Sequence, residues 1–183
     1  MLNRMRLMLS VFIFAFFVGA VSAETDGASN VSNKAELFGL PFNDLSLSLL
    51  ERHLKSLGLQ KYPSYKAGVV SYSLGPKGIL GVTNATIYSN TSGYIHQALL
   101  SGVIESSEDR QALGELLEKK YGTPGSGQLK TGVGRAKWLF DDDTSIELHN
   151  DSYDVSITYI DEKPMVDSHT GEIDVEALLR KNQ

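Results

Sequence analysis

The order of hydrophobic and polar positions along the chain predicts two helices. Leucines repeat at helical spacing over residues 44–57, directly after Asn43, which is a suitable N-cap. A second helix is predicted over residues 107–121, because residues 106–109 have the character of a capping box and Gly122 follows the apolar stripe. Both helices have one apolar face, so we expect both to pack on a common core.

Six stretches of alternating apolar and polar residues predict strands in two groups of three. Turn-forming residues separate the members of each group. A segment with five glycines between the groups, 122–134, is predicted to be a mobile loop or a loose hairpin. The six predicted strands are 69–74, 79–88, 94–103, 135–140, 145–149 and 153–159.

Each half of the chain therefore consists of a helix followed by a three-stranded meander. This order predicts an α+β fold with a mainly antiparallel sheet, in which the two meanders form one sheet and both helices pack on one face. Residue identity between the halves is too low to show a sequence repeat, so the predicted duplication is structural.

The first 23 residues have the three-part pattern of a secretory signal. Residues 1–6 form a short basic start with Arg4 and Arg6, residues 7–20 form an uncharged apolar run of 14 residues, and residues 21–23 are Val-Ser-Ala. We predict cleavage after Ala23. A retained membrane anchor is the alternative, but a spanning helix needs roughly 20 apolar residues. The signal predicts a periplasmic or secreted protein.

The rest of the chain indicates the kind of organism that exports the protein and the boundaries of its domain. The absence of cysteine favours a bacterial periplasm, because small eukaryotic secreted domains usually contain disulfides. We expect a disordered leader over 24–36, an α+β domain over 37–160, and an acidic tail over 161–183 with a short helix near 175–181. Four Asn-x-Ser/Thr triplets leave a eukaryotic, glycosylated protein open, namely those at Asn30, Asn84, Asn90 and Asn150.

Several structural positions resemble a known pattern. The run at 116–124, Trp138, the segment 146–148 and Tyr159 resemble small exported bacterial proteins of unknown function. The helix-plus-meander halves also resemble the β-lactamase-inhibitor-like proteins. That resemblance covers at most residues 37–160 and implies a protein-binding role, but it assigns no catalytic or binding residue.

Charge narrows the choice of partner. The 183 residues carry a formal charge of −5, and the segment from Asp141 to Glu176 holds 12 acids and one base. An acidic chain argues against nucleic acid or an anionic membrane surface as the partner. The field of the second half would instead steer a cationic partner or divalent ions, although acidic faces also serve simply to keep a domain soluble.

Two groups of acidic residues are candidates for ion or partner contacts. Glu147 and His149 alternate outward on one predicted strand, and Asp154 lies across a short turn, so these three side chains could converge on a cation. Asp141, Asp142 and Asp143 could bind calcium through oxygen ligands, but they lack the spacing of a calcium loop. A solvated sheet face and a turn are the alternative interpretations of the two groups.

We find no motif for catalysis, a metal or a cofactor, and therefore assign no residue to any of them. There is no G-x-S-x-G sequence, and the glycine pair Gly122 and Gly127 is followed by Gln128 where a phosphate-binding loop needs Lys. The leading hypothesis is a non-enzymatic module of the cell envelope that binds a protein or peptide, with a basic partner favoured. The alternatives are an envelope hydrolase, or a small-ligand or calcium-binding protein that uses the acids of 141–154.

Overall fold

The computed structural model describes residues 31–166. The predicted signal sequence and the predicted short helix near 175–181 lie outside the described residues. None of the helices among the described residues is long and apolar enough to span a membrane.

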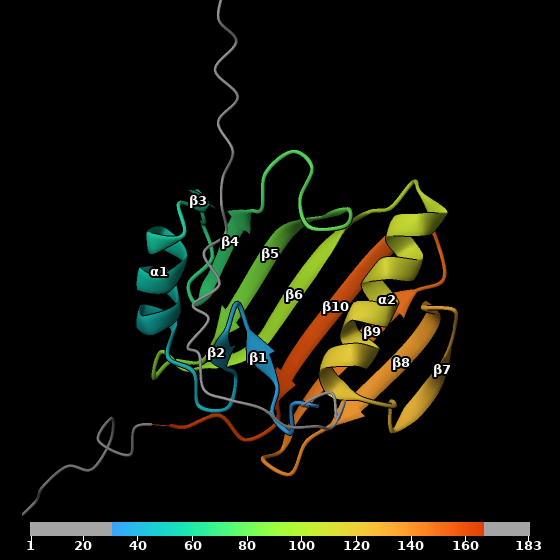
Figure 1. The fold of residues 1–183 in the computed structure, drawn as a ribbon. Coiled ribbons are helices and arrows are strands. Elements are labelled where there is room, and N and C mark those ends of the chain that lie inside the picture. The colour runs from blue at the N-terminus through green and yellow to red at the C-terminus, as the bar shows by residue number, and fades with distance from the viewer. Residues whose placement is uncertain (1–30, 167–183) are drawn as a thin grey trace, which may run out of the picture.

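Eight antiparallel strands form one sheet (Figure 1) in the order β3-β4-β5-β6-β10-β9-β8-β7. The two consecutive meanders meet at the centre, where β6 pairs with β10. The predicted α+β class with a mainly antiparallel sheet is confirmed. The strands are β3 (Gln60–Tyr62), β4 (Val69–Ser73), β5 (Val82–Ser89), β6 (Ile95–Val103), β7 (Ser126–Lys130), β8 (Val133–Leu139), β9 (Thr144–Asn150) and β10 (Asp154–Asp161).

The six predicted strands do not include the two edge strands, β3 and β7, although a loose hairpin over 122–134 is one of the predicted alternatives. All three residues of β3 are exposed, so the strand has no alternating pattern to detect. The segment 122–134 contains β7 and the start of β8, so the hairpin interpretation is confirmed and the loop interpretation is wrong. Thr131 and Gly132 both have positive φ, at 50° and 75°. Such a pair forms the tight two-residue turn that matches the twist of a hairpin.

Helix α1 spans Leu47–Ser56, and Ser46 is its N-cap. The predicted start at residue 44 after an Asn43 cap is wrong, because the backbone of the intervening residues pairs with the sheet. The amide of Ile95 donates to the carbonyl of Leu45 at 2.9 Å, and the amide of Leu47 donates to Gly93 at 2.8 Å.

Helix α2 spans Ser107–Tyr121, as predicted. The hydroxyl of its N-cap, Ser106, accepts from the amide of Asp109 at 3.0 Å. Gly122 ends the helix with a φ of 76°, a conformation that costs glycine little.

A small hairpin lies between the two helices in Figure 1 and consists of β1 (Glu36–Leu37) and β2 (Leu40–Pro41). Its turn residues Phe38 and Gly39 have positive φ, at 51° and 83°. Ala35 is buried and Glu36 belongs to β1, so the last residues of the predicted leader lie within the fold.

The core lies between the sheet and the layer formed by the helices and the hairpin (Figure 1). Tyr153 is the first residue of the predicted strand 153–159, but it precedes β10 and is 66% exposed. Among residues 31–166, no helix lies over the other face of the sheet (Figure 1). Among the largest fully buried side chains are Leu37, Phe42, Leu50, Leu54, Ile87, Ile95, Ile146 and Leu148.

Candidate functional site on the open face of the sheet

The open face of the sheet carries a continuous row of polar side chains. Residues directly opposite one another in a sheet point to the same face. Ser156 on β10 lies opposite Ser101 on β6 and His149 on β9. The register extends this row across seven strands through Ser73, Asn84, Ser101, Ser156, His149, Arg135 and Gln128.

A second row lies next to the first and is also mostly polar. In it, the hydroxyl groups of Ser71 and Thr86 are 3.1 Å apart, and Lys137 pairs with Glu147 at 2.7 Å. The register places Ser71, Thr86, Leu99, Thr158, Glu147 and Lys137 in this second row. We define the two rows together as the open face.

The first row runs into a wide groove of about 990 Å³ at one end of the sheet. Strands β5, β6, β8, β9 and β10 all contribute to it, together with the segments that connect β4 to β5, β6 to α2 and β9 to β10. Side chains of the row that line the groove are Asn84, Ser101, Ser156, His149 and Arg135.

The groove carries more negative than positive side chains. Four acids line it, against the two bases Lys77 and Arg135. Arg135 forms an ion pair within the protein, in which its Nε donates to Asp151 Oδ2 at 2.8 Å. This hydrogen bond holds the pKa of Asp151 below its usual range, so Asp151 stays ionised at neutral pH. The four acids are Glu105, Asp109, Asp151 and Asp154.

The structure brings two of the predicted site residues together. His149 and Asp154 both line the groove. Glu147 lies in the neighbouring row, where Lys137 neutralises its carboxylate at 2.7 Å. Among the described residues, no three His, Asp or Glu side chains are arranged as metal ligands.

The aspartates at 141–143 lie in the turn between β8 and β9, at the end of β9 opposite His149. Asp142 Oδ1 accepts from the hydroxyl of Thr144 at 2.6 Å and from its amide at 3.3 Å. Asp143 has a φ of 61° and pairs with Lys163 at 2.9 Å. These contacts stabilise the turn and hold the segment that follows β10. Strand β9 thus separates Asp141, Asp142 and Asp143 from the groove.

A hydrogen-bonded pair that the sequence did not reveal holds the rim of the groove. Arg110 on α2 donates to Asn150 Oδ1 at 3.3 Å and to the carbonyl of Ile104 at 2.6 Å, and it also donates to the carbonyl of Ser152. In return, Asn150 Nδ2 donates to the carbonyls of Arg110 at 2.8 Å and of Gly132 at 3.0 Å. The pair therefore joins α2 to three loops of the sheet.

Asn150 has no exposed surface, so the folded chain offers no access for a glycan at this triplet. The short turn predicted between His149 and Asp154 contains Asn150. The sequence around Asn150 does not distinguish an exposed turn asparagine from a buried one. The hydrogen-bond partners of the Asn150 side chain are 18 and 40 positions away in the chain, so the local sequence does not reveal them.

Comparison with known proteins gives no significant match to a protein family, a curated protein or a solved structure.

Proposed function

We propose that this protein is a non-enzymatic binding module of the cell envelope, and that it recognises a protein or peptide through the open face of its sheet. The observation that carries the proposal is the broad, mostly polar surface formed by the two rows and the groove. The envelope location rests on the signal predicted at residues 1–23.

The side chains of the open face suit a protein partner. Serine and threonine lose little rotamer freedom when they become buried, so ordering them at an interface costs less than ordering lysine or glutamate. Their hydroxyl groups both donate and accept hydrogen bonds. A broad surface of this kind can meet backbone and side-chain groups of a partner over many strands.

The charge of the groove favours a basic partner. Asp154 and Glu105 line the groove and form no ion pair among the contacts of the described residues. A lysine or arginine of the partner could complete such a pair. Complementary charge of this kind raises the association rate and is screened by salt.

The arrangement of strands supports the further proposal that the domain is a structural duplication. The first unit would consist of α1 with β3–β6, and the second of α2 with β7–β10. Their last strands, β6 and β10, meet at the centre of the sheet. The resemblance of these halves to the β-lactamase-inhibitor-like proteins stays a prediction, and it agrees with a protein-binding role.

The proposal can be tested by affinity capture from an envelope extract, with residues 24–183 as bait. This segment contains the whole described fold. Ser156 lies at the centre of the first row, so Ser156→Arg should place a bulky charge on the open face. Ser48→Arg makes the same chemical change on the exposed side of α1, across the sheet. We expect one protein to be lost with Ser156→Arg and kept with Ser48→Arg.

The opposite result would contradict the proposal. If Ser156→Arg retains the partner while Ser48→Arg loses it, the binding surface is on the helical side. Equal capture by both variants would mean that the open face takes no part in recognition.

The electrostatic part of the proposal has its own test. Asp154→Asn removes a charge from the groove, whereas Asp141→Asn removes one from the far end of β9. We expect Asp154→Asn to weaken capture and to reduce its sensitivity to salt, while Asp141→Asn should leave both unchanged. Equal effects of the two variants would show that the general negative field, and not the groove, attracts the partner.

A further inference from the structure

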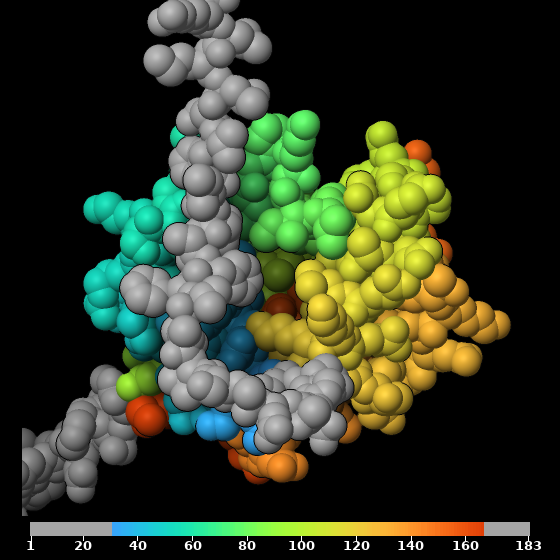
Figure 2. Space-filling view, in the orientation of Figure 1, coloured from blue at the N-terminus to red at the C-terminus, as the bar shows by residue number. Residues whose placement is uncertain are grey.

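An apolar cavity of about 320 Å³ lies on the helical side of the sheet, away from the open face. Figure 2 shows the hollow between the green segment before β5 and the yellow helix α2, with atoms of β6 and β10 at its floor. The side chains that line the inner part of the cavity are Phe38, Leu100, Leu113, Leu117, Ile157 and Tyr159.

The mouth of the cavity is also apolar on two sides. Ile79 is 54% exposed and Leu116 is 50% exposed, and both line the cavity. Exposed side chains of this size that continue into an apolar cavity are typical of a ligand site. An ion pair between Lys120 and Glu36, 3.0 Å apart, forms another part of the lining.

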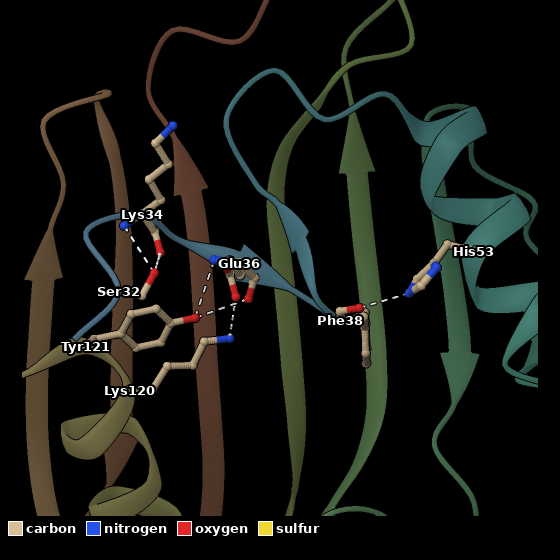
Figure 3. Close-up of polar contacts among 7 residues, drawn as sticks. All are labelled: Ser32, Lys34, Glu36, Phe38, His53, Lys120 and Tyr121. Atoms are coloured by element: carbon tan, nitrogen blue, oxygen red, sulfur yellow. Dashed lines mark hydrogen bonds and ion pairs between the residues drawn. The ribbon is translucent and has the colours of Figure 1, made fainter. Parts of the chain in front are cut away.

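The charged side chains of the lining, Lys120 and Glu36, and the Tyr121 hydroxyl have partners within the protein. Figure 3 shows the Tyr121 hydroxyl between the amide and the carbonyl of Glu36, at 3.3 and 3.2 Å. Burial raises the pKa of Tyr159 well above its ordinary value, and the nearby Tyr121 adds to the rise, so Tyr159 stays neutral. A ligand inside the cavity would therefore contact mostly apolar atoms and no unpaired charge.

The walls are fixed before any ligand arrives. The hairpin is tied to α2 through Tyr121 and Lys120, and to α1 through His53, whose Nε2 is 2.9 Å from the carbonyl of Phe38 (Figure 3). On the other side, the turn at Ile79 closes through two backbone bonds to Val82, at 2.9 and 3.0 Å. A preformed cavity loses little entropy when it binds.

We propose that this cavity binds the hydrocarbon chain of a small amphiphile, a medium-chain acyl or alkyl compound whose polar head stays at the mouth beside Lys120 and Glu36. The apolar lining and the absence of an unpaired charge exclude a charged group from the interior. A cavity of about 150 Å³ holds one benzene molecule, so a volume of about 320 Å³ suits a chain of medium length.

The test uses octan-1-ol as a neutral probe and the methyl NMR spectrum of residues 24–183 as the readout. We expect saturable shifts at Leu113, Leu117 and Ile157, which line the cavity. Leu100→Phe fills the floor and should weaken binding at least about tenfold. Leu139→Gln changes an exposed leucine of β8 outside the cavity and should leave binding unchanged.

A second variant keeps the test interpretable if Leu100→Phe fails to fold. Leu116→Gln makes the half-exposed mouth polar without touching the floor, and it too should weaken binding of octan-1-ol. Saturable shifts in the cavity that both Leu100→Phe and Leu116→Gln reduce would support the proposal. Shifts spread over the open face, shifts that do not saturate, or unchanged affinity in a folded Leu116→Gln variant would overturn it.

Discussion

Arg110 and Asn150 show how much of this fold depends on single polar contacts. Asn150 is fully buried and donates two hydrogen bonds to backbone carbonyls of α2 and of the β7–β8 turn. Both carbonyls would lose a donor if the amide were removed, and each lost hydrogen bond lowers the free energy of unfolding. This pair was beyond sequence-based prediction, because its members belong to elements 40 residues apart.

We predict that Asn150→Ala lowers the free energy of unfolding by about 1–3 kcal/mol. The loss follows from the two hydrogen bonds that Asn150 Nδ2 no longer donates, to the carbonyls of Arg110 and Gly132. Urea denaturation measures it, and Asn33→Ala, at an exposed position, is the control, with an expected change within about 0.5 kcal/mol. Equal stability of the two variants would show that the network does not hold the fold.

Asp161, the last residue of β10, has a buried carboxylate. It accepts from the backbone amides of Asp44 at 3.1 Å and Lys163 at 3.0 Å. Burial raises its pKa above the ordinary value, because desolvation disfavours the charged form, and the nearby carboxylates of Asp44 and Asp142 add to the rise.

This raised pKa predicts a pH dependence of stability that Asp161→Asn removes. As the pH falls from 7 towards the unfolded value of about 3.9, the folded state takes up a proton at Asp161 before the unfolded state does. The free energy of unfolding of the natural protein should therefore rise relative to Asp161→Asn over this window, and level off below it. Chemical denaturation of both proteins at several pH values measures the difference. Parallel pH profiles would contradict the prediction.

At the scale of elements, helix α2 approaches the β7–β8 turn at two glycines. A Cβ atom at Gly114 would lie 1.8 Å from the carbonyl oxygen of Gly132. The helix can pack this closely only because position 114 has no side chain. The same contact lets Asn150 reach the carbonyl of Gly132.

We predict that Gly114→Ala destabilises the protein by about 1–3 kcal/mol through overpacking. Inside an unhindered helix the same change would stabilise by up to about 1 kcal/mol, so the sign of the effect is diagnostic. Thermal unfolding provides the measurement. Gly125→Ala is the matched control, because its Cβ would lie 3.7 Å from the nearest atom. A Gly114→Ala variant as stable as Gly125→Ala would contradict the close approach.

The elements that were predicted correctly are those with a strong local signal. The capping residue Ser106 and the terminal Gly122 mark α2 within the sequence itself. The start of α1 was misplaced, because tertiary bonds of Leu45 and Leu47 override a good capping residue at Asn43. Strand β3 was missed, because exposed edge residues need not alternate.

For the whole molecule, alternation indicated that His149 and Glu147 face outward, but not which other side chains they would meet. Strand order and register decide that, and alternation within one strand does not specify which strand is its neighbour. The register places His149 beside Ser156 and Arg135, whereas Asp141, Asp142 and Asp143 lie at the other end of β9. The polar surface that results spans both predicted halves of the chain, so it exists only once β6 and β10 have paired.

The affinity of the captured partner for three purified forms of the protein tests the central claim most directly. We predict that Ser156→Arg raises the dissociation constant at least about tenfold, a loss of about 1.4 kcal/mol, because it disrupts the centre of the open face. Ser48→Arg should stay within about twofold of the natural protein, a difference of about 0.4 kcal/mol. Unchanged affinity of a folded Ser156→Arg variant would contradict recognition through the open face.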